Sequence, residues 1–157
     1  MILTSLFLIV FSVGSSTPSN SGDRWAEYLE KANEDAANCE EFYDVMSRHK
    51  DENATAEGYF ALATMIQAKR FGNPFTKLSY FNKGKKILEE VINANPENAE
   101  LRFLRFAVQT KVPAILLYYH DIDDDQVVLD DYVSKHDDGL AERIKRFYEM
   151  KKIESNI

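Results

Sequence analysis

Three aspartates at alternate positions, Asp121, Asp123 and Asp125, have the spacing that opens an EF-hand calcium loop, in which carboxylate oxygens converge on one cation. Two later parts of that motif are missing. Gln126 stands where a sharp-turn glycine is needed, and Tyr132 stands where a bidentate glutamate is needed. We therefore expect the run to begin a helix, with Asp121 or Asp123 as its cap and the other carboxylates near its positive end. A weak divalent-cation site is the alternative.

Basic residues gather around a predicted chain break over residues 71–78: Lys69, Arg70, Lys77, Lys83, Lys85 and Lys86. Because the C-terminal half is acidic, this arrangement implies a charge dipole across the molecule. The cluster is either a docking surface for an anionic partner or a set of solvated helix faces. Phe75 lies in the break and either plugs the core or stands exposed as a binding anchor. The candidate partner-binding residues are Phe75, Lys77, Lys83 and Lys86.

The residue types that catalysis needs do not form a known motif. His49, His120 and His136 are the only histidines, and none lies three or four positions from another, so a zinc site would need three separate turns to converge. The sequence has no GxSxG motif and no glycine-rich phosphate loop. Cys39, the single cysteine, is expected to be a small buried apolar residue and not a reactive thiol. We expect no enzymatic activity and no cofactor.

Length and composition predict one helical domain. The chain has 157 residues, of which 45% are hydrophobic and 12% aromatic, enough for a substantial core. Its formal net charge of −7 disfavours nucleic acid as a partner, because phosphates attract a coherent Lys/Arg surface. The chain has only four prolines and six glycines. Turn-rich β folds use more of both, so the composition favours helices.

The N-terminal segment has the pattern of a cleavable export signal. Residues 2–13 are almost entirely apolar, a run of about a dozen that suits a signal peptide and is too short to span a bilayer. Small residues follow at Gly14, Ser15 and Ser16. Because no Lys or Arg precedes the run, the alternative is an uncleaved N-terminus that packs somewhere or tethers the protein to a membrane. We predict a signal peptide over 1–21 and a periplasmic or secreted mature protein without a stable membrane span.

Apolar residues at steps of three and four predict an all-α fold, an irregular array of about six to seven helices. The expected helices cover about 24–49, as one broken helix or two short ones, then 55–70, 79–93, a helix from 99, 121–134 and 140–151.

The helix that starts near Ala99 is expected to be the most buried element. Pro113 should kink it or begin a new apolar helix that continues to Tyr119. We predict a single domain over 23–152 and a flexible tail over 153–157.

Charged residues inside these helices carry further expectations. Arg102 and Arg105 lie in the most apolar helix, so at least one guanidinium should be partly buried and need a carboxylate or carbonyl partner. We expect this contact to be an ion pair that locks two helices. Glu89 and Arg143 are predicted on the solvent-facing sides of their helices.

Residues 84–98 resemble the second helix of a tetratricopeptide (TPR) repeat. Gly84, Leu88, Val91 and Pro96 stand where that family has a small residue, a large apolar one, another small or apolar one and a turn proline. The small residue lets the paired helices approach closely, and the proline stops the second helix.

The resemblance covers only part of the chain. The preceding helix lacks the family's tryptophan, leucine-glycine and tyrosine pattern, and the loop over 71–78 is longer than a repeat allows. The resemblance implies one degenerate TPR-like hairpin in an irregular array and not a tandem solenoid. The wider stretch 55–125 is similar to a group of small exported bacterial proteins with no assigned activity.

These observations favour an exported helical module that binds another protein, through a groove between helices, without catalysis. One alternative is a divalent-cation-binding protein that uses the acidic segment 121–131. The other alternative is an unrecognised hydrolase.

Overall fold

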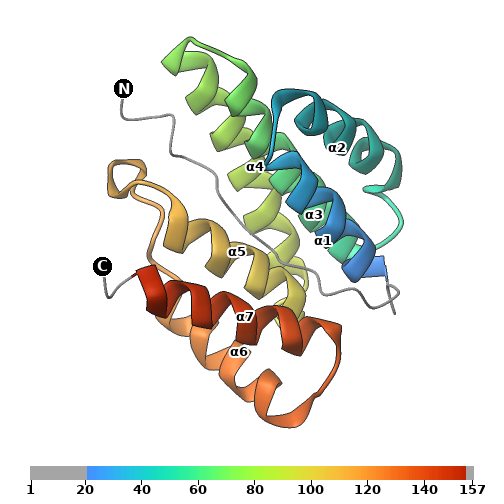
Figure 1. Ribbon diagram of the computed structural model, residues 1–157, viewed down its shortest axis with the longest axis vertical. Helices are drawn as coiled ribbons and strands as arrows, with labels where there is room; N and C mark the ends of the chain where they lie inside the picture. The colour runs from blue at the N-terminus through green and yellow to red at the C-terminus, as the bar shows by residue number, and fades with distance from the viewer. Residues whose placement is uncertain (1–20, 155–157) are drawn as a thin grey trace.

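The computed structural model describes residues 21–154, and this part of the chain is all-α, as predicted (Figure 1). Its elements are α1 (Ser21–Ala32), α2 (Ala36–His49), α3 (Ala54–Ile66), the 3-10 turn η1 (Gln67–Arg70), α4 (Pro74–Ala94), α5 (Ala99–Lys111), the 3-10 turn η2 (Ala114–Leu116), α6 (Ile122–Lys135) and α7 (Gly139–Glu154).

Short polar side chains set where most of these helices begin. The side chains of Asp35, Asn53, Asn73 and Asn98 each accept a hydrogen bond from a backbone N–H in the first turn of α2, α3, α4 and α5. Such caps satisfy donors that the helix itself leaves unpaired, and each contributes about 1 kcal/mol. The break between α1 and α2 shows that the segment 24–49 is two short helices.

The helices form a layered array around the α3–α4 hairpin (Figure 1). Helices α1 and α2 pack against α3 on one side, and α5 leads from the hairpin to α6 and α7 on the other. Phe147 of α7 makes edge-to-face contacts with Phe103 and Phe106 of α5, with ring centroids 5.7 and 5.9 Å apart. Helix α5 is buried over most of its length, as its sequence predicts.

Gly84 allows the close approach of α3 and α4. A Cβ atom at this position would lie 2.4 Å from the backbone oxygen of Ala61 and 2.4 Å from Cγ of Met65. Neither distance is tolerable for a carbon atom, so only glycine fits without moving a helix. This packing role is the one that the TPR-like pattern predicts for Gly84, while membership of that family stays a prediction.

Two predicted boundaries are wrong. Helix α4 begins at Pro74 and not near residue 79, because Asn73 caps it and proline is well suited to the first helical position. The connection from η1 to α4 is therefore only residues 71–73. The predicted kink or apolar helix at Pro113 does not form either. Helix α5 ends at Lys111, and the short turn η2 follows with Ile115 83% exposed.

The two ends of the described chain refine the predicted domain limits. Ser21 and Gly22 already belong to α1, and α7 continues to Glu154, past the predicted start of the tail. The rest of the predicted signal peptide, including the apolar run 2–13, lies outside the described residues. Within residues 21–154, no helix is both long and apolar enough to cross a membrane.

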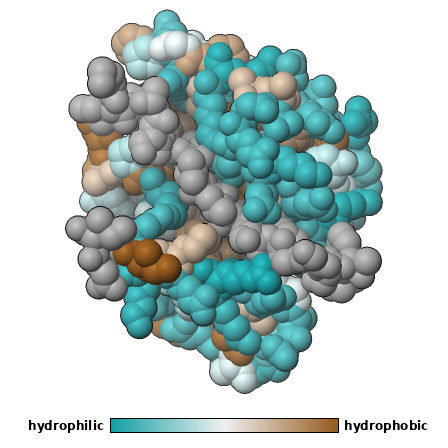
Figure 2. All heavy atoms as spheres, in the orientation of Figure 1, coloured by the Kyte–Doolittle hydropathy of each residue, from teal (hydrophilic) through white to brown (hydrophobic). Residues whose placement is uncertain are grey.

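Exposed apolar side chains are few. Figure 2 shows a largely hydrophilic face, with apolar atoms along the edge where the η2 loop and the end of α7 lie. Exposed apolar residues of these two segments are Ile115, Leu117 and Ile153.

Candidate functional site

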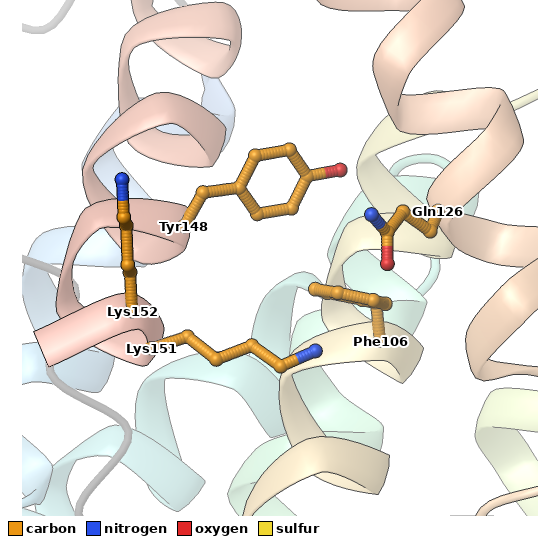
Figure 3. Close-up of a pocket in the computed structure, with 5 residues that line it drawn as sticks. All are labelled: Phe106, Gln126, Tyr148, Lys151 and Lys152. Carbon is orange, nitrogen blue, oxygen red and sulfur yellow. The ribbon is translucent and has the colours of Figure 1, made fainter. Parts of the chain in front are cut away.

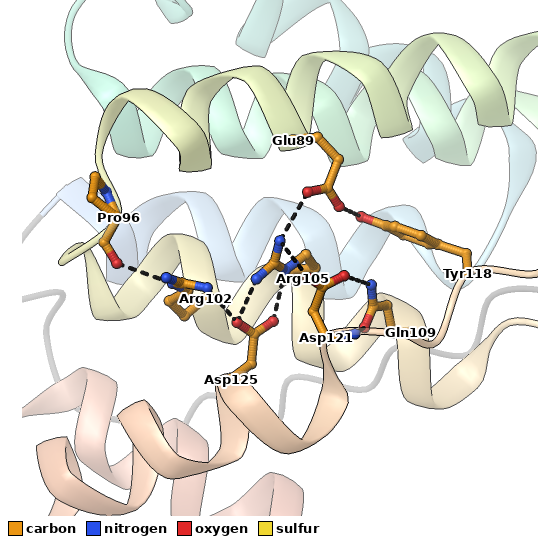
Figure 4. A network of polar contacts seen from close by, with 8 residues as sticks. All are labelled: Glu89, Pro96, Arg102, Arg105, Gln109, Tyr118, Asp121 and Asp125. Carbon is orange, nitrogen blue, oxygen red and sulfur yellow. Dashed lines mark hydrogen bonds and ion pairs between the residues drawn. The ribbon is translucent and has the colours of Figure 1, made fainter.

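Arg105 is the centre of a buried ionic network that joins α4, α5 and α6 (Figure 4). Its Nε and Nη2 donate to the two carboxylate oxygens of Asp125 at 2.8 and 2.7 Å, and Asp125 is fully buried. Its Nη1 donates to Glu89 at 2.8 Å and lies 3.3 Å from an oxygen of Asp121. Arg102 donates to Asp125 at 3.0 Å. The predicted interhelical ion pair is confirmed, whereas the solvent-facing assignment of Glu89 is wrong because its carboxylate turns inward to Arg105.

Polar side chains extend this network to the segment after η2. The Tyr118 hydroxyl donates to Glu89 at 2.6 Å. Gln109 donates to the Asp121 carboxylate at 2.9 Å and accepts from the Asp121 backbone N–H at 3.2 Å. These bonds fix the chain that leads from α5 into α6, so the network holds both helices and their connection.

A second buried network surrounds Arg143 of α7. Its guanidinium donates to the Tyr59 hydroxyl and to Glu100, each at 2.8 Å, and lies 3.2 Å from the Asp23 carboxylate. Tyr59 donates in turn to Glu100 at 2.9 Å. These four residues come from α7, α3, α5 and α1, so this cluster ties together the first and last described helices.

The prediction that Arg143 faces solvent is wrong. Arg143 lies three residues after Leu140 and four before Phe147, so helical periodicity places it on the buried stripe of α7. The network also requires glycine at position 22, because a Cβ atom there would clash with the Glu100 carboxylate oxygens at 2.3 Å. The three partners of Arg143 come from other helices, and spacing along α7 alone does not reveal them.

The arginines and tyrosines of both networks each keep one protonation state near neutral pH. Burial disfavours the charged forms of Arg105 and Arg143, but hydrogen bonds and attraction from neighbouring carboxylates outweigh this effect and raise both pKa values. Burial, together with adjacent carboxylates, also raises the pKa of Tyr59 and of Tyr118. Arginines that stay charged and tyrosines that stay neutral are suited to holding helices together. General acid–base catalysis instead needs groups whose pKa lies near the working pH.

The acidic run does begin a helix, but not through the predicted side-chain cap. Asp121 occupies the N-cap position of α6, but its side chain makes no capping hydrogen bond. Its carboxylate instead contacts Arg105 and accepts a hydrogen bond from Gln109. Asp125 is turned inward to the arginines, while Asp123 is exposed in the first turn of α6. Asp121 and Asp125 are both directed to Arg105 and Asp123 is exposed, so the three candidate calcium ligands do not converge on one point. Among residues 21–154, no cluster of three or more His, Cys, Asp or Glu side chains could hold a metal ion.

The histidines lie apart, next to aromatic rings. His49 has its ring 5.0 Å from that of Trp25, and its Nδ1 lies 2.5 Å from a carboxylate oxygen of Glu52. His120 and His136 each lie against a neighbouring tyrosine ring.

Cys39 is a buried residue, as predicted. Its Sγ donates to the Ala32 carbonyl at 3.0 Å, and burial raises the pKa of the thiol. A raised pKa disfavours the reactive thiolate.

The four candidate partner-binding residues all lie on α4. Phe75 is 82% exposed, which decides between the two predictions made for it and leaves it outside the core. At about 100° per residue, Phe75, Lys83 and Lys86 fall within about 80° of one another around the helix, whereas Lys77 lies about 200° from Phe75. The structure therefore brings three of the four onto one side, which we call the basic α4 face: Phe75, Lys83 and Lys86.

Charge is segregated around this face. Residues 58–88 contain six of the 19 basic residues of the chain and none of its 26 acidic ones. Two of the six already have partners: Lys69 donates a hydrogen bond to the Asn33 side chain at 2.9 Å, and Arg70 forms an ion pair with Glu40 of α2 at 2.9 Å. On the basic α4 face, Lys83 is exposed, and Lys86 has only a loose surface contact with Glu90 at 3.8 Å.

No family model matches this chain, and neither a curated protein nor a solved structure matches it.

Proposed function

We propose that this protein is an exported helical module that binds an acidic segment of another protein through the basic α4 face. The observation that carries the proposal is an exposed aromatic side chain, Phe75, on the same side of a helix as two lysines, within a segment free of acidic residues. Export is supported by the apolar run 2–13 followed by small residues.

The exposure of Phe75 supports a role in binding and not in folding. An aromatic side chain that is 82% exposed gives up most of the stabilisation it would gain by burial. Aromatic residues are enriched among the side chains that dominate protein–protein affinity. Leu78, one turn further along α4, is 42% exposed and adds apolar surface beside it.

The charges indicate the kind of partner. Lysines at the edge of a docking surface speed association with an acidic partner and discourage a basic one. The protein as a whole is acidic, with a net charge of −7, so the basic α4 face is where an acidic partner meets least repulsion.

Photo-crosslinking from position 75 tests this proposal. We expect a photoreactive phenylalanine analogue in place of Phe75 to capture one protein in the cells that make this chain. The control carries the same analogue in place of Val127, which is 70% exposed on α6 and outside the basic α4 face. Equal capture from both positions, or none from position 75, would contradict the proposal.

A further inference from the structure

An acceptor sequence for N-linked glycosylation lies at the start of α3. Asn53, Ala54 and Thr55 fit the pattern Asn-X-Ser/Thr in which X is not proline, and no other asparagine of the chain fits it. Such a short pattern also arises by chance. Its place in the fold therefore decides whether the asparagine is able to carry a glycan.

The amide of Asn53 presents its nitrogen for modification while its oxygen holds the helix. Asn53 is the N-cap of α3, and its Oδ1 accepts a hydrogen bond from the backbone N–H of Ala56 at 2.9 Å. A glycan is joined to the other amide atom, Nδ2, which makes no hydrogen bond with the described residues. Modification at Nδ2 therefore leaves the cap intact.

The surface around Asn53 is polar and open. Asn53 is exposed, and so are Asp51 and Glu52 before it in the connection from α2 to α3. The large apolar side chains that the described residues expose lie on α4, α6, α7 and in the segment between α5 and α6, away from this connection. A glycan is bulky and hydrated, and an exposed polar connection accommodates it without disturbing the core.

The position of the acceptor leaves the basic α4 face free. The Thr55 hydroxyl accepts a hydrogen bond from the side chain of Asn98 at 3.2 Å, so the start of α3 lies beside the connection from α4 to α5. Phe75 is in the first turn of α4, and the 21 residues of this helix span about 30 Å. A glycan at Asn53 is therefore at the opposite end of the α3–α4 hairpin from Phe75.

We infer that Asn53 carries an N-linked glycan, a modification that rests on the proposed export. The donor is an oligosaccharide attached to a lipid diphosphate, and a transferase of the export path catalyses the step. Nδ2 forms a bond to the anomeric carbon of the first sugar, the bond from that carbon to the diphosphate oxygen breaks, and the lipid diphosphate leaves as Nδ2 loses a proton. Because Asn98 engages the Thr55 hydroxyl in the folded chain, the transfer precedes the folding of α3.

Intact mass spectrometry of the exported chain, purified from the cells that make it, tests this inference. We expect the polypeptide mass plus that of an oligosaccharide, with fragmentation locating the added mass at Asn53. Ala54→Pro should reduce the glycosylated fraction at least about tenfold, because proline at the middle position blocks the acceptor. The fold should tolerate this change, since Ala54 is the first residue of α3, where proline fits, and Asn53 is already extended with φ −167° and ψ 168°.

A matched pair at position 55 identifies the acceptor hydroxyl. Thr55→Ala should remove the added mass, whereas Thr55→Ser keeps the hydroxyl and should retain it. Added mass that survives Ala54→Pro would overturn the inference, and so would an exported chain without any added mass. The second result leaves the proposed export and partner standing, whereas a chain that stays inside the cell contradicts export as well.

The crosslink from position 75 provides a separate readout. Ala54→Pro should leave its yield unchanged, because the glycan lies away from the basic α4 face.

Discussion

Arg105→Met is expected to lower the free energy of unfolding by about 3 kcal/mol, because the fully buried Asp125 carboxylate then keeps only the single bond from Arg102. Asp125 is fully buried and receives two hydrogen bonds from Arg105, and Glu89 receives a third. Methionine matches the length of the arginine stem, so the loss measures the missing charge more than a cavity. Since small domains have only about 5–15 kcal/mol of stability, the variant should be close to unfolding.

Urea unfolding followed by tryptophan fluorescence measures this change. Trp25 is the only tryptophan of the chain and is 1% exposed, so its emission reports loss of the core. The control is Arg146→Met, which removes an α7 arginine from a surface pair with Glu142 and should cost less than about 1 kcal/mol. A loss below about 1 kcal/mol for Arg105→Met would contradict the role assigned to the network.

Gly84→Ala is expected to lower the free energy of unfolding by about 2 kcal/mol. The new Cβ would lie 2.4 Å from the Ala61 backbone oxygen and 2.9 Å from the Met65 backbone nitrogen, so α3 and α4 must separate. Overpacking of this kind costs about 1–3 kcal/mol, and we take the upper end because backbone atoms cannot rotate away. The better helix propensity of alanine returns about 1 kcal/mol.

Gly72→Ala is the matched control for this substitution. A Cβ atom at Gly72 meets nothing within 4 Å, and its backbone does not have a positive φ. The same change there should be neutral or stabilise the protein by up to about 1 kcal/mol, because alanine reduces the freedom of the unfolded chain. Equal effects at both positions would contradict the close approach of α3 and α4 at Gly84.

Features that depend on residues close together in the sequence were predicted well. Three- and four-residue spacing identifies the helices, and two arginines in an apolar helix predict a buried ion pair, which Arg105 forms with Asp125. Asn73 and Pro74 also carry a local start signal for α4, but the sequence interpretation treats Pro74 only as a helix breaker. The Asp121, Asp123 and Asp125 spacing suggests a cation loop, although two of the three carboxylates are directed to arginine.

Tertiary partners were the part that could not be predicted. Arg143 appears solvent-facing because its neighbours in sequence are charged, while its partners come from three other helices. An open cleft between α5, α6 and α7, lined by Phe106, Gln126, Tyr148, Lys151 and Lys152 (Figure 3), depends on how these helices pack, and no spacing within one helix predicts it. The exposure of Phe75 was likewise undecided until the start of α4 was located.

Charge reversal on the basic α4 face is the most direct test of the proposed function. The measurement is the yield of the crosslink from position 75 in cells that make Lys83→Glu with Lys86→Glu. The matched control is Lys31→Glu with Lys145→Glu, which reverses two exposed lysines on α1 and α7. We predict at least about a tenfold loss of yield for the first pair and little change for the control, because like charges across an interface repel. An unchanged yield for the first pair, or an equal loss for both, would contradict an acidic partner on this face.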